Sequence, residues 1–507
     1  MRRKLFSLPW AYLPKDKAAV VAVIASVRFV DFYQIASFQT CMTLHLQYIQ
    51  PNIPKTELAR HVGVAQGMFT AAQIISAPAW GVAVDRIGRK AVILIGLITT
   101  AIACVGVAFA GSIGAIFFWR LLAGATNGTV IAARTAMSDN LPPQSLPAGF
   151  SLLVLAFHVA NAIGPLVAAA SIGSSMEWLP FSTSPESSSA INANWKAKNP
   201  YSMPNLISAL VLMADAVLVW FKLKEVHDRN HQDWRRLMIK PYNWIRRCLT
   251  LHRDKWQYSP LTTFDNESLN EDSDVVEMQP VQTQLDSDRS KEQLETIWKL
   301  KFLIVLCTVA ILEFHLGAFG SLWPLFVVAG RRKPDAPVKL PFIFSGGLQL
   351  ENSDIGLAVG ALGFIGVLLQ LTVVPHITTI FGAVRAFKAT LPLFPASLFI
   401  APYLSLLTPD SPHALWMGIL FVLFLHVLGR SFGILVTILL VNQSTTQPSR
   451  RGTVHGIANA VANTFRTAGS IAGGSLYGLG VERNSVGLGW WLTGSVSLLG
   501  WMLGPWV

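Results

Sequence analysis

Long apolar runs separated by short polar segments make up most of this chain. Twelve of the runs have close to the ~20 residues that an α-helix needs to cross the hydrocarbon core of a bilayer. The predicted helices cover approximately residues 18–44, 62–84, 90–110, 113–137, 148–172, 205–221, 302–328, 355–377, 386–406, 413–441, 455–479 and 486–506. The pattern therefore predicts an all-α, polytopic membrane protein with twelve transmembrane helices.

The segment between the sixth and seventh runs, residues 222–300, has a different composition. It is basic in its first part and acidic in its second, and the acidic part has too few aliphatic residues to bury a core. We therefore predict a disordered cytoplasmic linker between two six-helix bundles, residues 1–221 and 301–507. His227 and His231 have the spacing of metal ligands on a helix, but histidines in a polar segment are usually solvated. We expect no metal ion and no cofactor.

The composition fits a surface that faces lipid. Hydrophobic residues make up 52% of the 507 positions and charged residues only 13%. The net charge of +12 suggests nucleic acid as a partner. Most cations, however, lie between apolar runs, where they set the topology and contact anionic headgroups. Because we also find no paired catalytic motif, no HExxH and no phosphate-binding loop, we expect neither nucleic-acid binding nor an enzyme.

The polar segment between the second and third helices carries four charges. Charges cannot lie in the hydrocarbon, so this segment must be a tight turn at a water interface. Its pattern, G-x-x-x-D-R-x-G-R-K, resembles the signature loop between helices 2 and 3 of the major facilitator superfamily. The residues of this gating loop are Gly81, Asp85, Arg86, Gly88, Arg89 and Lys90. The resemblance implies two six-helix bundles and alternating access. It also implies that Asp85 pairs with an arginine or a helix N-terminus across the gap between the bundles.

Two other helices carry motifs of the same family. Arg120-x-x-x-Gly124 resembles the arginine motif of the fourth helix, and Gly164-Pro165 resembles the Gly-Pro motif of the antiporter branch. Pro165 removes a backbone donor and Gly164 permits close packing, so we predict a hinge in the fifth helix. Motifs resembling a fungal group near the drug:proton antiporters and zinc-induced-facilitator-like carriers occur at Leu322–Phe326, Arg451–Gly456 and Gly487–Trp491.

The two halves of the chain match each other, as expected for an internal repeat. Asp31 in the first helix corresponds to Glu313 in the seventh, and Arg120 in the fourth corresponds to Arg430 in the tenth. The segment around Gly382 resembles a degenerate copy of the gating loop. Such repeats place the binding cavity at their interface near the middle of the membrane. The residues predicted for the cavity and for proton coupling are Arg28, Asp31, Arg120, Asp215, Glu313, His315 and Arg430.

The two repeat-related acids are predicted to have different roles. Arg28 lies one helical turn from Asp31, so this pair is either a structural salt bridge or part of the substrate site. Glu313 has no cation close to it in the sequence. An unpaired carboxylate in apolar surroundings binds a proton readily. We therefore predict that Glu313 carries the coupling proton and that proton and substrate compete for one site.

Together these features predict a secondary active transporter, with proton-coupled efflux of a small organic molecule such as a drug or a secondary metabolite. The alternatives are a vacuolar transporter of a metal or metal chelate and a non-transporting nutrient sensor in the membrane. We expect a monomer in the plasma membrane or the vacuolar membrane, with both termini in the cytoplasm.

Overall fold

The computed structural model describes residues 14–172, 199–223, 281–332, 338–407, 412–444 and 451–503, with the backbone alone for 281–300. Almost all of these residues are helical, and apart from two isolated β-bridges the described part contains no strand. Most of the predicted linker, including His227 and His231, lies outside the described residues, although α11 begins inside it, at Val281. The boundaries of the linker and of the two bundles stay predictions.

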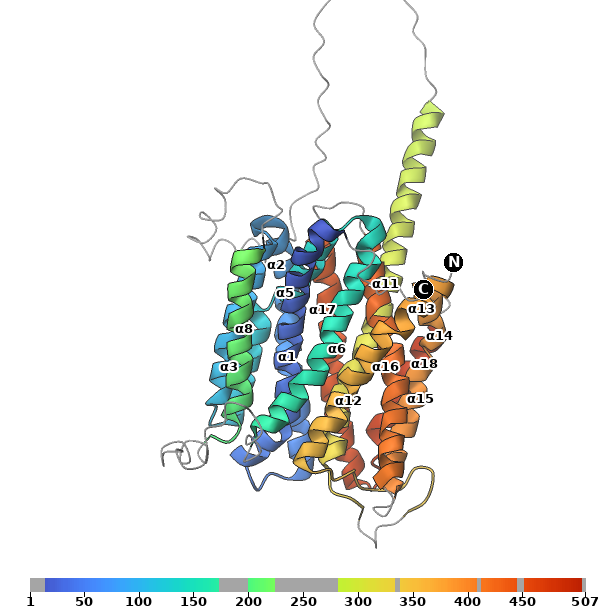
Figure 1. The fold of residues 1–507 in the computed structure, drawn as a ribbon. Helices are drawn as coiled ribbons and strands as arrows, with labels where there is room; N and C mark the ends of the chain where they lie inside the picture. Colours follow the sequence, from blue (N-terminus) through green and yellow to red (C-terminus); the bar gives the residue numbers. More distant parts are fainter. Residues whose placement is uncertain are drawn as a thin grey trace, which may run out of the picture. The chain divides into compact units, whose positions relative to one another are not determined.

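The helices run side by side (Figure 1). Those of the first half are α1 (Ala18–Ile49), α2 (Lys55–Ile87), α3 (Arg89–Ala108), α4 (Ile113–Thr126), α5 (Thr129–Asn140), α6 (Leu146–Ser171) and α8 (Ser202–Lys222), with short 3₁₀ helices at Lys15–Lys17 and Pro143–Ser145. Those of the second half are α11 (Val281–Val328), α12 (Asn352–Leu371), α13 (Val373–Phe381), α14 (Ala383–Thr390), α15 (Leu393–Ile400), a 3₁₀ helix at Ala401–Leu406, α16 (Pro412–Gln443), α17 (Arg451–Glu482) and α18 (Leu488–Leu503).

Some predicted helices are interrupted, which corrects the sequence prediction. The helix predicted over 113–137 is split into α4 and α5 at Asn127 and Gly128. Asn127, the C-cap residue of α4, accepts hydrogen bonds at its Oδ1 from the backbone N–H and the hydroxyl of Thr129, the first residue of α5, at 3.1 and 2.7 Å. The break is therefore encoded by a polar side chain that the hydropathy pattern does not reveal.

Prolines explain two further breaks. The helix predicted over 355–377 is divided between α12 and α13, and the one predicted over 386–406 is divided between α14 and α15. Pro375 lies in the first turn of α13 and Pro392 directly precedes α15. Because proline has no backbone N–H, it cannot continue the hydrogen bonding of the preceding helix.

Two glycines form equivalent turns in the two halves. Gly88 alone connects α2 to α3 and has a φ of 95°, a conformation that strains residues with a side chain. Gly382 connects α13 to α14 in the same way, with a φ of 81°. The same backbone turn at corresponding places supports the internal repeat.

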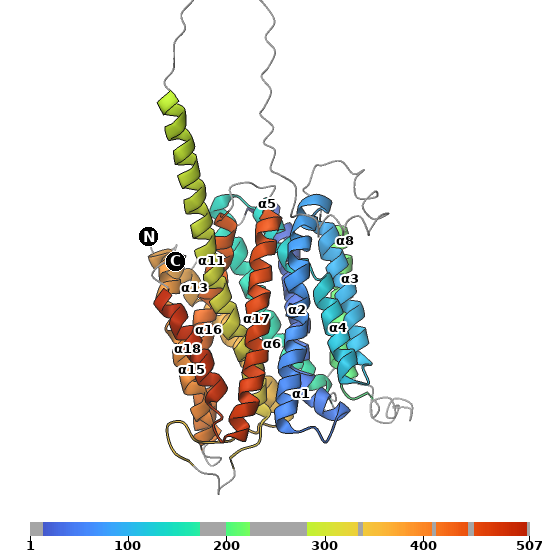
Figure 2. The ribbon, with the colours of Figure 1, turned by 180° about the vertical axis from the view of Figure 1, so that it is seen from behind.

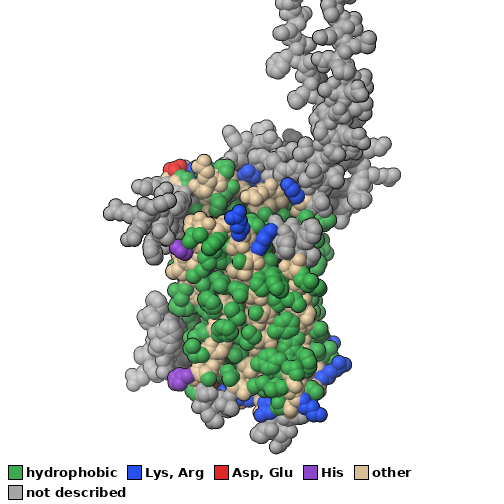
Figure 3. All heavy atoms as spheres, turned by 90° about the vertical axis from the view of Figure 1, so that its right-hand side faces the viewer, with side chains coloured by type: hydrophobic (Ala, Val, Ile, Leu, Met, Phe, Trp, Pro, Cys, Tyr) green, Lys and Arg blue, Asp and Glu red, His purple; other side chains and the backbone are tan. Residues whose placement is uncertain are grey.

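Among the described residues, ten helical segments are long and apolar enough to cross a membrane, judged by length and composition alone. α17, which is rich in small and polar residues, and α18, with 16 described residues, complete the predicted set of twelve spans. On the face in Figure 3, hydrophobic side chains cover the middle, and lysines and arginines lie towards the two ends. Such an apolar band between charged ends is typical of a protein that spans a bilayer.

Two long helix pairs join the halves within one compact unit. α17 lies along α2 (Figure 2), and α12 lies along α6. Glycines permit the approach of α17, since a side-chain carbon at Gly81 would lie 2.6 Å from the carbonyl oxygen of Gly452. Near the other end of α2, a side-chain carbon at Gly474 of α17 would lie 2.7 Å from the carbonyl oxygen of Ala59 of α2. The backbones of α2 and α17 are therefore in close contact near both ends of α2.

Candidate functional site: a central cavity and a gate

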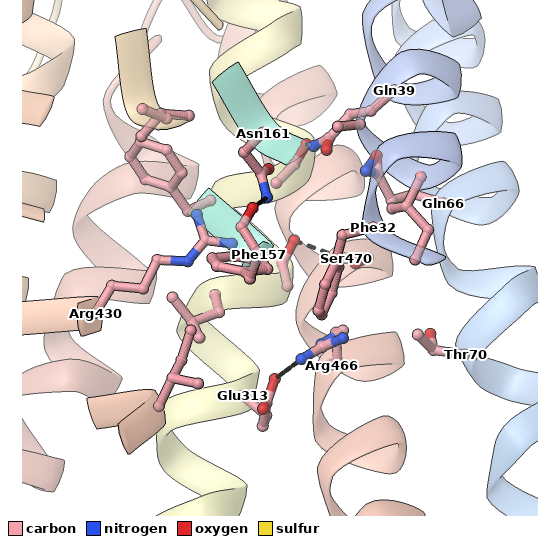
Figure 4. A pocket seen from close by; sticks show the side chains of 18 of the residues that line it. Phe32, Gln39, Gln66, Thr70, Phe157, Asn161, Glu313, Arg430, Arg466 and Ser470 are labelled. Carbon is pink, nitrogen blue, oxygen red and sulfur yellow. Dashed lines mark hydrogen bonds and ion pairs between the residues drawn. The ribbon is translucent and has the colours of Figure 1, made fainter. Parts of the chain in front are cut away.

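A cavity of about 130 Å³ lies between the two halves, where the internal repeat predicts it. Its walls come from α1, α2, α4, α5 and α6 of the first half and from α11, α12, α16 and α17 of the second. Figure 4 shows the amide side chains of Gln39, Gln66 and Asn161 towards one end, with Arg430 and Arg466 below them in the view. The cavity is thus polar at several places along its wall.

Arginines dominate the charge of the lining. The charged lining residues are Arg28, Arg120, Arg134, Arg430, Arg466 and Glu313. Arg430 lies over the ring of Phe157, with its guanidinium carbon 4.4 Å from the ring centroid, and Arg28 lies 4.3 Å from that of Phe32. Stacking on a ring leaves the N–H groups at the edge of the guanidinium free to donate. The wall therefore presents both cations and aromatic surface.

Arg28 and Asp31 form a buried ion pair, with 3.0 Å between Nη1 and Oδ2. Asn127 donates a second hydrogen bond to Asp31 Oδ1, at 2.7 Å. Because Asn127 lies at the break between α4 and α5, the break places this donor. Asp31 is 2% exposed and does not line the cavity, whereas Arg28 does. The geometry makes Asp31 a residue that positions Arg28.

Glu313 pairs with Arg466 of α17, so the expectation that it lacks a cationic partner is wrong. Arg466 Nε donates to Glu313 Oε2 at 2.8 Å, and Nη2 donates to the same oxygen. The two residues are 153 positions apart, so the sequence near Glu313 gives no sign of the pair. Among the described lining residues, Glu313 is the single carboxylate.

Two predicted cavity residues lie elsewhere. Asp215, on α8, is 6% exposed and is not among the lining residues. His315, on α11, is also buried and packs its ring 4.2 Å from that of Phe394, outside the lining. Both belong to the interior of their own half.

The predicted hinge lies at a close contact between α6 and α1. A side-chain carbon at Gly164 would lie 3.1 Å from the carbonyl oxygen of Tyr33, and Pro165 is inside α6. Gly164 therefore permits the predicted close packing. Bending at this point stays a prediction.

Asp85 joins the two halves at one end of α2. Its carboxylate accepts hydrogen bonds from the backbone N–H groups of Gly452 (3.1 Å) and Thr453 (2.9 Å), and from the Thr453 hydroxyl (2.9 Å). Both partners lie in the first turn of α17, where free N–H groups and the helix dipole favour an anion. The predicted contact of Asp85 with a helix N-terminus is therefore present.

A second carboxylate, Asp139 at the end of α5, strengthens the same junction. Its Oδ2 lies 2.8 Å from Arg89 Nη2, and its Oδ1 lies 3.5 Å from Arg451 Nη1. Arg89 belongs to the gating loop, and Arg451 begins α17 of the other half. In the rest of the loop, Lys90 donates to a backbone carbonyl of α8 at 2.7 Å, and Arg86 is exposed.

Sequence reasoning missed Arg134, Asp139 and Arg466. An ionisable residue within an apolar run is itself a sign of a functional site. That rule selected Arg28, and applied to every run it would also have selected Arg134 and Arg466, whereas Asp139 lies just beyond the run predicted over 113–137. The partners of Asp139 and Arg466 could not have been found in the same way, because they lie on other helices.

Twelve membrane helices in two similar halves around a central cavity define a multi-pass membrane transporter. Residues 23–332 match the family described as Major Facilitator Superfamily. The chain belongs to this superfamily, whose members carry small molecules across membranes and are not enzymes.

The chain is 25% identical over 526 residues to the major facilitator superfamily multidrug transporter mfsB of Aspergillus fumigatus, an alignment that covers 98% of this chain and 84% of that protein. Its fold is similar to that of the human organic anion transporter MFSD10, with a TM-score of 0.59 and 15% identity over 97% of this chain and 100% of that one. It is also similar to a D-xylose–proton symporter, with a TM-score of 0.62 and 12% identity over 96% of each chain. These two structures confirm the predicted twelve-helix fold.

Proposed function

We propose that this chain exports a small organic molecule by alternating access through the cavity between its halves. The observation that carries the proposal is a cavity lined by both halves and bounded by the glycine-mediated contacts of α2–α17 and α6–α12. Separation of these pairs at one end would open the cavity to one side of the membrane. Export is supported by the multidrug transporter of Aspergillus fumigatus that matches nearly the whole chain.

The hydrogen bonds of Asp85 serve as the gate in this cycle. They join the two halves, so they exist only while the adjacent ends of α2 and α17 are together. A contact that is complete in one state and broken in the other shifts the balance between the states. We assign the end with Asp85 to the cytoplasm of a plasma or vacuolar membrane, since the basic residues of the gating loop lie there.

Protons act on this cycle through Glu313. A proton on this carboxylate would remove the negative charge that holds Arg466. The charge that the cavity offers to a substrate would then change with pH. This role rests on the ion pair of Glu313 with Arg466. It replaces the earlier prediction that Glu313 binds a proton because it has no cationic partner.

The test is export from yeast cells that lack their own drug pumps and are loaded with a panel of fluorescent drugs of different charge. A valine at Gly456 would wedge α17 from α2, because a side-chain carbon there would lie 2.9 Å from the carbonyl oxygen of Ala77. Gly114 of α4 has nothing within 4 Å of the same position and provides the control. We expect export by the wild type and by Gly114→Val, and its loss in Gly456→Val at equal membrane level. Equal accumulation of every drug with and without the chain would reject export.

A further inference from the structure

We propose that the substrate of the cavity is an organic anion with an aromatic body, bound by arginines of both halves. This inference rests on the proposed transport function and names the substrate class of the same cavity. Arg120 and Arg134 come from the first half, and Arg430 and Arg466 come from the second.

The charge of the lining supports an anion. Five arginines against one glutamate leave a formal charge of +4 on the cavity wall. Asp31, which pairs with Arg28 from behind the wall, lowers this excess to +3. Arginine stays protonated at any physiological pH. The cavity is therefore positive whether or not Glu313 carries a proton.

Three of these arginines have no counter-charge in the described part of the chain. No described carboxylate lies within ion-pair distance of Arg120, Arg134 or Arg430, and the Nε atom of each is buried without a hydrogen-bond partner. A buried charge without a counter-charge is costly in a membrane protein, and such residues generally serve a ligand or ion path. An ion pair accounts for the burial of Arg28, whose partner is Asp31, but no ion pair accounts for these three among the described residues. The missing charge is that of the substrate.

Aromatic side chains supply the apolar part of the site. Those that line the cavity are Phe32, Phe69, Phe157, Phe319 and Trp323. In Figure 4, Phe32 and Phe157 lie in the space bounded by the side chains of Arg430, Arg466 and Asn161. Aromatic faces favour planar apolar groups, and a cavity of about 130 Å³ is similar in size to one that holds benzene. A small aromatic anion therefore matches the lining in both charge and shape.

A cationic drug fits the same lining poorly. The single carboxylate among the described lining residues already has Arg466 as its partner. A cation that displaced Arg466 would leave a fourth arginine without a counter-charge. The arginines therefore select against cations as well as for anions.

An anionic substrate also determines how protons and voltage act. Protonation of Glu313 would free Arg466, so a proton and an anion would favour each other's binding. This is the opposite of the competition predicted from the sequence. An anion that leaves the cytoplasm moves in the direction favoured by an inside-negative potential. The membrane potential is therefore the driving force when a monovalent anion leaves without the proton, whereas export of the two together transfers no net charge.

The test uses three ligands with one benzene ring and different charge: benzenesulfonate, benzenesulfonamide and benzyltrimethylammonium. Their binding to the purified full-length protein is measured by calorimetry at constant ionic strength. We expect benzenesulfonate to bind at least tenfold more tightly than the neutral and the cationic compound.

Variants show whether the arginines bind the anion. Arg430→Gln should weaken benzenesulfonate binding at least tenfold, and Arg430→Lys, which keeps the charge, should restore part of it. Arg483, an exposed residue outside the cavity, provides the control, and Arg483→Gln should bind as the wild type does. The melting temperature without ligand reports whether each variant is folded.

Equal or tighter binding of the sulfonamide or the ammonium compound would overturn the proposal, as would no binding of benzenesulfonate. Wild-type affinity in folded Arg430→Gln would overturn the assigned site. Each of these results leaves the transport function intact, since export is measured separately with drugs of every charge. If no drug is exported, the transport function fails, while binding to the purified protein still reports the charge preference.

Discussion

The gating loop and its degenerate copy differ in the residue three positions before the glycine of the turn. In the first half this residue is Asp85, which accepts three hydrogen bonds from the start of α17. In the second half it is Thr379, whose hydroxyl donates to the carbonyl oxygen of His376 in its own helix, at 2.8 Å. The glycine turn is kept in both copies, at Gly88 and Gly382. We infer that the turn serves the fold, whereas the carboxylate serves the contact between the halves.

The acids on the first helix of each half differ in a similar way. Asp31 and its partner Arg28 have side chains that are only 3% and 5% exposed. Glu313 is 11% exposed, and its partner Arg466 is 34% exposed. The first pair is therefore almost completely buried, with Arg28 in the cavity wall and Asp31 behind it, and the second faces the space that a substrate would occupy.

The largest expected effect is the loss of stability on removing the charge of Asp31. Asp31→Asn leaves Arg28 buried without a counter-charge, which costs about 3–5 kcal/mol. Glu313→Gln should cost much less, because Arg466 is exposed to the cavity and can be hydrated. The measurement is the melting temperature and the membrane yield of both variants. Equal stability of the two would contradict the distinction between a buried and an open pair.

The next effect is a shift between the states of the transporter on removing the charge of Asp85. Asp85→Asn weakens charge-assisted hydrogen bonds to Gly452 and Thr453, each worth about 1.5–3 kcal/mol. Loss of one such bond would shift the balance of the two states roughly ten- to hundredfold towards opening at this end. The measurement is the rate at which a thiol reagent, added from the Asp85 side, labels a cysteine that replaces Thr70 of the cavity. The four native cysteines are removed first.

Thr379→Asn in the degenerate copy is the matched control for this shift. Thr379 is exposed and bonds only within α13, so the labelling rate should not change. An equal increase in both variants would show that any change near a glycine turn opens the cavity. The proposed difference between the two loops would then be wrong.

The sequence predicted features that depend on neighbouring residues and missed those that depend on folding. The gating loop could be recognised because Asp85 and Gly88 lie within one short segment, and a helix N-terminus, which attracts anions, was one of the two partners predicted for Asp85. Arg466 was missed because it meets Glu313 only when α17 packs against α11. The break at Asn127 was missed because the apolar run continues across it, although the amide of Asn127 bonds both Thr129 at the start of α5 and Asp31.

The smallest effect is expected on anion binding after removal of the charge of Glu313. Glu313→Gln frees Arg466, whose side chain is 34% exposed, from a pair that water in the cavity screens to about 1 kcal/mol, so benzenesulfonate should bind about fivefold more tightly. Calorimetry at constant pH measures the affinity of the variant and of the wild type, with Glu482→Gln at an exposed acid as the control. Weaker binding in Glu313→Gln would mean that the carboxylate itself contacts the substrate, and it would favour a cation over the proposed anion.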